Sequence, residues 1–235
     1  MFAGPNGSGK STLLADLRGR FSLGVYINAD DIEQTLRDRG FLHLDDFGLN
    51  ASNDDLQAFF ASGQTALSKN LMAAVPLRIE RKVLVLTPGT AADSYLAASI
   101  ADFLRHQLLA ARQSFTFETV MSHPSKLDLL RLAAAQGYRT YLYFIATETP
   151  AVNVGRVENR VSKGGHPVPT DKIVSRYQKT LQLLPEAIQL VDRAYLFDNS
   201  GEYIWWFAEY EPKLLTIIGE ELPEWFRKAW LKLPG

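Results

Sequence analysis

The sequence predicts an α/β protein in which a mostly parallel sheet lies between helices in a three-layer α/β/α arrangement. Two observations carry this prediction. Short apolar runs with the length of strands alternate with longer amphipathic segments with the length of helices, a pattern typical of a parallel sheet covered on both faces. In addition, residues 4–11 form a glycine-rich motif of the kind that joins a strand to a helix.

The elements follow in order along the chain. Apolar runs predict strands at Val25–Ile27, Val83–Leu86, Phe115–Phe117, Thr140–Ala146 and Ala194–Phe197. Apolar residues that recur near the helical period of about 3.6 residues predict helices over Ile32–Arg37, Asp93–Arg112, Leu127–Ala135 and Ile173–Val191.

Two regions depart from this alternation. Residues 41–55 are rich in Asp and Asn, and we expect a polar loop that leads into a helix within an insertion at about 38–85. All four tryptophans lie in the last 31 residues. We expect residues 1–200 to form one domain and residues 201–235 to pack on it as a tryptophan-rich extension; an aromatic surface for a partner is the alternative.

Composition excludes several classes of protein. The chain has 235 residues, of which 46% are hydrophobic, so it can bury a full core. It contains no cysteine, which excludes disulfides, cysteine-based metal sites and a thiol nucleophile, and which fits the cytoplasm. A net charge of −1 argues against a nucleic-acid partner. We expect no membrane partner, because no segment resembles an export signal or a membrane span.

The glycine-rich motif predicts a phosphate site. Gly4–Ser11 matches G-x-x-x-x-G-K-[ST] in full. Such a loop turns its backbone N–H groups toward phosphate oxygens, its lysine reaches the terminal phosphates, and its serine ligates Mg²⁺. We therefore expect ATP and Mg²⁺ to bind here, with Ser11 as the metal ligand. The predicted phosphate-binding residues are Gly4, Pro5, Asn6, Gly7, Ser8, Gly9, Lys10, Ser11 and Thr12.

The strand before this motif is unusually short. Only Met1, Phe2 and Ala3 precede Gly4, whereas such a loop normally follows a buried strand of several residues. A shortened central strand leaves pairing groups of its neighbours exposed. We expect either a marginally stable fold or an edge where the first strand should be.

The ends of two predicted strands carry candidate functional residues. Asp30 follows the predicted strand Val25–Ile27, where a carboxylate can take the proton of an attacking hydroxyl; Asp31 is a second candidate, and capping of the next helix is the alternative. Glu118 and Thr119 end the strand at 115–117 and are placed to bind substrate or hydrated Mg²⁺, or to cap a helix.

A basic segment at about 154–170 predicts a lid. Arg156 and Arg160 lie four residues apart, hence on one helix face. Arginines in such a position stabilise the charge of a transferred phosphoryl group. A solvated basic helix is the alternative. His166 lies in a turn of this segment, where a structural role is the simpler interpretation.

Together these residues resemble the zeta toxin family of P-loop kinases. The resemblance rests on Gly4–Thr12, Ile27–Ile32, Ser114–Lys126 and Arg156–Pro169, and Gly137-Tyr138 and Asp198-Asn199-Ser200 also fit it. It implies an ATP- and Mg²⁺-dependent transfer of phosphate to UDP-N-acetylglucosamine and a partner antitoxin protein. By resemblance, Asp30 matches the catalytic base, Glu118 and Thr119 a substrate-side strand end, and Arg156 or Arg160 the phosphate-contacting arginine. The insertion and the tryptophan-rich tail depart from the family pattern.

The sequence thus predicts a kinase that phosphorylates a hydroxyl of a small molecule, such as a nucleotide sugar. Its catalytic residues would be Lys10, Asp30, Arg156 and Arg160, and Asp31, Glu118 and Thr119 would contact the substrate. The alternatives are an ATPase or switch without an acceptor, a polynucleotide 5′-kinase, and an inactive P-loop module that binds a partner through residues 205–235. A polynucleotide kinase is disfavoured by the slightly negative net charge.

Overall fold

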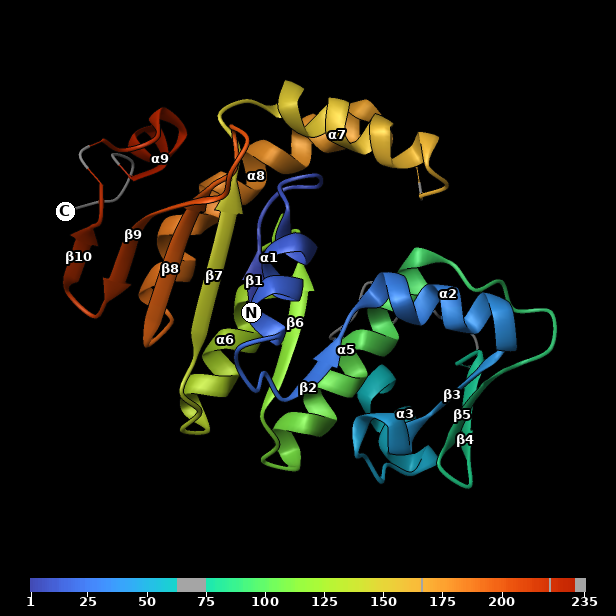
Figure 1. Ribbon diagram of the computed structural model, residues 1–235. Helices are drawn as coiled ribbons and strands as arrows, with labels where there is room; N and C mark the ends of the chain where they lie inside the picture. Colours follow the sequence, from blue (N-terminus) through green and yellow to red (C-terminus); the bar gives the residue numbers. More distant parts are fainter. Residues whose placement is uncertain (63–74, 166, 220, 231–235) are drawn as a thin grey trace. The chain divides into compact units, whose positions relative to one another are not determined.

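The computed structural model describes residues 1–62, 75–165, 167–219 and 221–230 (Figure 1). The chain forms two compact units. Unit 1 comprises Met1–Phe21 and Glu118–Gly235, and unit 2 comprises Ser22–Phe117. Parts of the predicted insertion (63–74), lid (His166) and extension (220 and 231–235) lie outside the described residues.

Unit 1 is built on a mostly parallel sheet with the strand order β10-β9-β8-β7-β1-β6. Strands β7 (Tyr141–Ala146) and β8 (Arg193–Asp198) are parallel, as are β1 (Phe2–Ala3) and its neighbours β7 and β6 (Phe115–Thr119). Strands β9 (Trp205–Glu211) and β10 (Leu214–Ile217) add an antiparallel hairpin. The predicted α/β class with a mostly parallel sheet is therefore confirmed.

The first strand is short, as expected, but it is not lost. Phe2 and Ala3 pair with Glu118 and Thr119 on one side and with Tyr143 and Phe144 on the other. The side chains of Phe2 and Ala3 are 1% and 0% exposed. The expected edge is thus wrong at these two residues, because burial of Phe2 and pairing on both sides hold the strand between β6 and β7.

The helices of unit 1 are α1 (Lys10–Arg18), α6 (Ser125–Ala135), α7 (Pro150–Ser162), α8 (Thr170–Gln189) and α9 (Glu224–Trp230). Helix α7 begins with a proline, whose fixed φ suits the first turn. Helix α8 packs against α7 and α9. In the tail, which belongs to unit 1, Trp225 and Phe226 are buried, while Trp205 and Trp206 are 39% and 41% exposed.

Unit 2 contains β2 (Val25–Ile27), which pairs in parallel with Phe115–Phe117, the first three residues of β6. Its helices are α2 (Ala29–Arg39), the 3₁₀ helix η1 (Leu44–Phe47), α3 (Asn53–Ala61) and α5 (Ser94–Ala110). A second sheet, with order β3-β5-β4, consists of β3 (Phe41–His43), β4 (Leu77–Glu80) and β5 (Val83–Leu86).

This second sheet corrects two expectations. Val83–Leu86 is a strand, but it pairs antiparallel with β3 and β4 rather than joining the parallel sheet. Residues 41–43, expected in a loop, form β3 and pair with β5. The cause is a tight turn at Arg81 and Lys82, whose φ angles of 48° and 65° reverse the chain directly between β4 and β5.

Candidate phosphate-binding site

The glycine-rich motif lies between the end of β1 and the start of α1, as predicted. Gly9 caps α1 with a φ of 98°, and Gly7 has a φ of 74°; both values are in the left-handed region that favours glycine. A Cβ on Gly7 would lie 2.8 Å from the carbonyl oxygen of Asn153, and one on Gly9 would lie 2.3 Å from Nδ2 of Asn199. The loop therefore needs glycine at both positions.

Polar groups converge on this loop. Nζ of Lys10 donates to the carbonyl oxygens of Gly4 and Pro5, at 2.9 Å each. Oδ1 of Asn6 and Oγ of Ser8 are buried without a hydrogen-bond partner among the described residues. Because buried polar atoms in native proteins are nearly always paired, these two atoms indicate a site built for a polar ligand.

Ser11 is joined to the predicted substrate-side strand end. Its hydroxyl donates a hydrogen bond of 2.8 Å to Oε2 of Glu118, the fourth residue of β6. Thr119 follows, and its hydroxyl accepts a hydrogen bond from the backbone N–H of Met121 at 3.1 Å. Thr12 is exposed on the first turn of α1. The structure thus brings Ser11 and Glu118 together, while the Thr119 hydroxyl is used in a local turn.

Two asparagines hold backbone carbonyls of the loop, and these contacts were not apparent from the sequence. Nδ2 of Asn153, on α7, donates to the carbonyl oxygen of Asn6 at 2.6 Å, and the hydroxyl of Thr147 hydrogen-bonds to Oδ1 of Asn153. Nδ2 of Asn199 donates to the carbonyl oxygen of Ser8 at 2.8 Å. Each side chain thus fixes one backbone carbonyl of the loop.

The basic residues of the predicted lid lie on α7. Nη2 of Arg156 is 3.5 Å from the carbonyl oxygen of Gly201, and Nη1 is buried without a partner among the described residues. Arg160 is exposed one turn later. Val157, which is 2% exposed, faces the core. A guanidinium nitrogen without a partner fits an anion-binding role for Arg156.

Asp30 and Asp31 lie in unit 2, in the first turn of α2 directly after β2. The cap of this helix is Asn28, whose side-chain oxygen accepts from the backbone N–H of Asp30 at 3.0 Å. Capping therefore does not require either aspartate side chain. Both residues are exposed.

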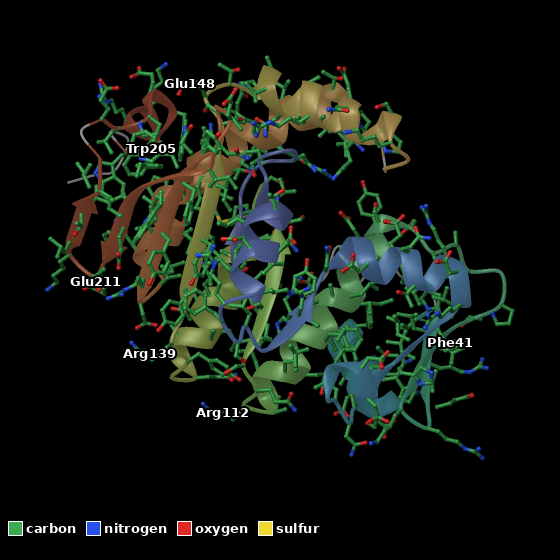
Figure 2. All side chains as sticks on the ribbon, in the orientation of Figure 1. Phe41, Arg112, Arg139, Glu148, Trp205 and Glu211 are labelled. Carbon is green, nitrogen blue, oxygen red and sulfur yellow. The ribbon has the colours of Figure 1, made fainter. Side chains whose placement is uncertain are left out.

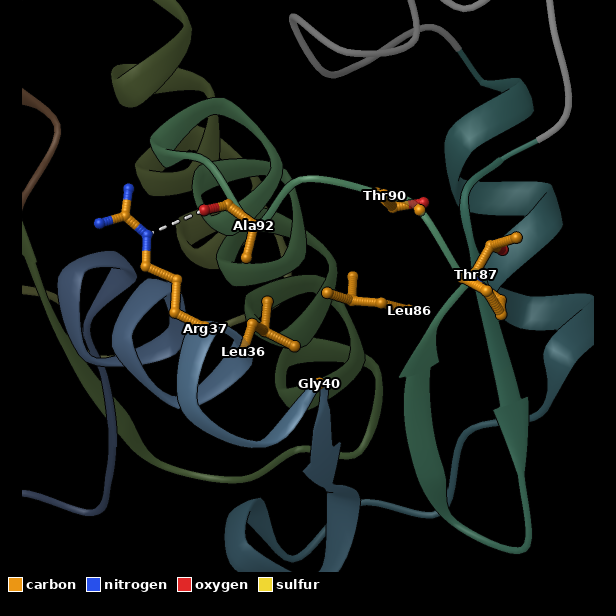
Figure 3. A pocket seen from close by; sticks show the side chains of 9 residues that line it. Leu36, Arg37, Gly40, Leu86, Thr87, Thr90 and Ala92 are labelled. Carbon is orange, nitrogen blue, oxygen red and sulfur yellow. Dashed lines mark hydrogen bonds between the residues drawn. The ribbon is translucent and has the colours of Figure 1, made fainter.

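A cavity of about 430 Å³ also lies in unit 2, between the end of α2 and the segment 86–92 (Figure 3). Arg37 lies at one side of it (Figure 3), where Nε donates to the carbonyl oxygen of Ala92 at 3.0 Å. None of the predicted site residues lines this cavity. Its lining residues are separate from the phosphate-binding loop in the sequence.

The residues of unit 1 fit ATP and Mg²⁺. The glycine loop, Lys10 and the unpartnered hydroxyl of Ser8 would hold the phosphates. Ser11 and Glu118 would hold Mg²⁺, which usually takes only one or two protein ligands besides phosphate and water. Such a site needs no larger cluster, and the described residues contain no group of three or more metal-ligating carboxylates and histidines.

Comparison with protein families finds a match to the model of the zeta toxin family over residues 94–206. The matched segment contains Glu118, Thr119, Arg156 and Arg160, whereas the phosphate-binding loop and Asp30 precede it. A comparison with curated proteins gives no match.

Solved structures that match this chain with a TM-score above 0.5 share its fold. The complex of AvrRxo1-ORF1 and ORF2 with ATP matches with a TM-score of 0.55 and 16% identity, over 99% of this chain and 64% of that chain. The same complex with sulphate ions has a TM-score of 0.54 at the same identity and coverage. A structure of the PezAT toxin–antitoxin system of Streptococcus pneumoniae matches over 86% of this chain and 70% of that chain, at 15% identity and a TM-score of 0.48.

Among the described residues, none of the helices has the length and apolar character needed to cross a membrane.

Proposed function

We propose, from the premise that residues 94–206 belong to the zeta toxin family of P-loop kinases, that this protein transfers the γ-phosphate of ATP to a hydroxyl of a small molecule. The observation that carries the proposal is the loop in unit 1. Its glycines adopt left-handed φ angles, and its lysine donates hydrogen bonds to two carbonyl oxygens of the loop. Its serine donates a hydrogen bond to Glu118. The AvrRxo1-ORF1:ORF2 complex with ATP, which has the same fold, supports ATP as the donor.

Each residue then has a defined task. The N–H groups of the loop and Lys10 bind and orient the ATP phosphates. Ser11 and Glu118 hold Mg²⁺, which supplies charge neutralisation for the phosphates. Asp30 accepts the proton of the acceptor hydroxyl as it attacks, and Arg156 or Arg160 binds the transferred phosphoryl group. Asp31 and Thr119 contact the acceptor.

A nucleotide sugar such as UDP-N-acetylglucosamine is the acceptor that the family resemblance favours, and the same resemblance supports an antitoxin protein as a partner in the cytoplasm. Domain limits of 1–200 and 201–235 remain part of this proposal. The donor site lies in unit 1, and Asp30 and Asp31 lie in unit 2.

The test is incubation of the protein with labelled ATP, Mg²⁺ and a panel of nucleotide sugars, with products identified by mass. A product heavier by one phosphate, absent with Lys10→Ala, is the expected result. ATP hydrolysis that no acceptor changes would instead indicate an ATPase or switch. Failure of the wild-type protein to bind ATP would indicate an inactive P-loop module.

A further inference from the structure

Several hydrogen bonds hold the turn that follows β8. Asp198, the last residue of β8, accepts from the backbone N–H of Ser200 through Oδ1 at 2.9 Å and from the Ser200 hydroxyl through Oδ2 at 2.8 Å. The Ser200 hydroxyl in turn accepts from the backbone N–H of Glu148 at 2.8 Å. The backbone N–H of Asn199 donates to the carbonyl oxygen of Ala146 at 2.8 Å. The turn 198–200 is therefore bonded to the end of β7.

One bond to this turn comes from the tryptophan-rich tail. Nε1 of Trp225, on α9, donates to Oδ2 of Asp198 at 2.7 Å. Trp225 is 2% exposed and Asp198 is 9% exposed, so the bond is shielded from water. The indole ring packs on Phe144 and Phe207, with ring centroids 5.9 Å and 5.6 Å away. The hydrogen bond is thus a directional polar contact within an aromatic cluster.

The same turn holds the phosphate-binding loop. Asn199, between Asp198 and Ser200, donates to the carbonyl oxygen of Ser8, and its Nδ2 would lie 2.3 Å from a Cβ on Gly9. Gly9 starts α1, and its neighbours Ser8 and Lys10 belong to the loop. A change in the direction of the Asn199 side chain would therefore move the loop between Ser8 and Lys10.

From this chain of contacts we propose that Trp225 is a positioning residue for ATP binding. Its indole N–H orients Asp198, Asp198 fixes the turn, and Asn199 holds Ser8 and Gly9 in the phosphate-binding conformation. This inference rests on the proposed function, and it assigns part of the tryptophan-rich tail to the site rather than to a partner.

Trp225→Phe isolates the polar contact, because phenylalanine retains an aromatic ring in the cluster but has no N–H. The loss leaves Oδ2 of a buried carboxylate with Ser200 alone among the partners described above. Trp230→Phe is the matched control, since Trp230 lies on the same helix and packs on Phe226 and Tyr210 instead. We expect Trp225→Phe to raise the dissociation constant of Mg·ATP about tenfold, and Trp230→Phe to leave it within about twofold.

Hydrogen exchange of the nucleotide-free protein gives a second readout that does not depend on activity. Peptides that cover residues 4–11 should exchange faster in Trp225→Phe than in wild type or Trp230→Phe. Asn199→Ala should weaken ATP binding as well, and adding Trp225→Phe to it should have little further effect, because the two residues act in series. In a kinase assay Trp225→Phe should raise KM for ATP and leave kcat nearly unchanged.

The outcomes separate the two proposals. Unchanged ATP binding and unchanged exchange of residues 4–11 in Trp225→Phe overturn the positioning role, even where the wild type is a kinase. Additive effects of Trp225→Phe and Asn199→Ala overturn it as well. If wild-type protein binds no ATP, the proposed function fails, and the exchange of residues 4–11 still decides whether Trp225 controls the conformation of the loop.

Discussion

Ser11 and Glu118 are joined by a hydrogen bond of 2.8 Å, although 107 positions separate them in the sequence. The strand register explains the contact, because Glu118 pairs with Phe2 just before the phosphate-binding loop. A serine hydroxyl can ligate Mg²⁺ through oxygen only if its proton has another acceptor. Glu118 supplies that acceptor and a negative charge beside the proposed metal position.

Glu118→Gln should therefore raise the Mg²⁺ concentration needed for half-maximal activity. Glutamine keeps the shape and can still accept from Ser11, but it lacks the charge that attracts the cation. An increase of about tenfold is expected, which corresponds to about 1.4 kcal/mol. The measurement is a Mg²⁺ titration at saturating ATP, with the exposed Glu186→Gln as a control. Identical titrations of wild type and Glu118→Gln would rule out a role in metal binding.

Asp30→Asn should abolish turnover without weakening ATP binding, because the carboxylate is assigned to the acceptor hydroxyl and not to the phosphates. Loss of a general base typically costs about 10²- to 10⁴-fold in rate. Asp38→Asn, at the other end of the same helix and bonded to Gln34, controls for the change of charge. Near-normal kcat for Asp30→Asn at saturating substrates would refute the assignment, and Asp31→Asn should be compared with it.

Gly7→Ala should weaken ATP binding, since its Cβ would lie 2.8 Å from the carbonyl oxygen of Asn153 at a φ of 74°. A strained residue of this kind costs about 1–3 kcal/mol, or about tenfold to a hundredfold in affinity if the loop moves. Gly155→Ala is the matched control. It lies in α7 with nothing within 4 Å of the added Cβ, and it should stabilise the fold by about 0.4–1 kcal/mol. Calorimetric titration with ATP and thermal unfolding measure the two effects, and equal affinities for both variants would contradict the prediction.

The phosphate-binding loop could be predicted from the sequence because its chemistry is local. Its glycines, lysine and serine are contiguous, and the motif alone implies a strand before it and a helix after it. Strands β2, β6, β7 and β8 were also recognisable, because each contains a short run rich in apolar residues. The contacts of Asn153 and Asn199 with the loop could not be found in this way. They depend on β7 and β8 bringing the start of α7 and the turn after β8 to the loop.

The antiparallel sheet of unit 2 was not predicted for a related reason. The hairpin between β4 and β5 turns at Arg81 and Lys82, two residues that carry no turn signal and yet adopt positive φ. The apolar run Val83–Leu86 is typical of a buried strand in either a parallel or an antiparallel sheet, so the strands that pair with it could not be inferred from the sequence. The Trp225–Asp198 bond was equally hidden, because the sequence shows that tryptophans are clustered but not which polar group each one meets.

Ser52→Ala should destabilise unit 2 by about 1 kcal/mol, the usual contribution of an N-cap. Ser52 and Asp55 form a capping box at the start of α3, with Asp55 accepting from the backbone N–H of Ser52 at 2.8 Å. These hydrogen bonds hold the pKa of Asp55 below its ordinary value of 3.8. A lowered carboxyl pKa stabilises the fold above pH 3.8, and this contribution is lost as the pH falls through the lowered pKa.

Urea unfolding of wild type and Ser52→Ala at pH 7 and pH 3 measures this effect. The difference in the free energy of unfolding between the two proteins should be largest at pH 7 and smaller at pH 3. Ser94→Ala serves as a control, because the cap of its helix is Asp93. A difference that does not change with pH would show that the carboxylate of Asp55 takes no part in the cap.

Glu148→Gln should stabilise the protein at neutral pH. Glu148 lies at the end of unit 1 that carries α9 (Figure 2), and burial, followed by the charge of Asp198, raises the pKa of its carboxyl above the ordinary value of 4.5. Between pH 4.5 and the raised pKa, the folded state binds more protons than the unfolded state, so stability falls as the pH rises through this window. Glutamine is neutral throughout and can still accept the hydrogen bond from the backbone of Glu224.

The melting temperature of Glu148→Gln should therefore exceed that of wild type at pH 7, and the two should converge near pH 4. The gain is expected to be small, because the side chain is exposed and water screens its repulsion from Asp198. Glu158→Gln, which makes the same change of charge at an exposed position of α7, should show no comparable gain at pH 7. A lower melting temperature for Glu148→Gln at pH 7 would mean that the ionised carboxylate stabilises the junction between β7 and α9, in which case its contact with Glu224 outweighs the repulsion from Asp198.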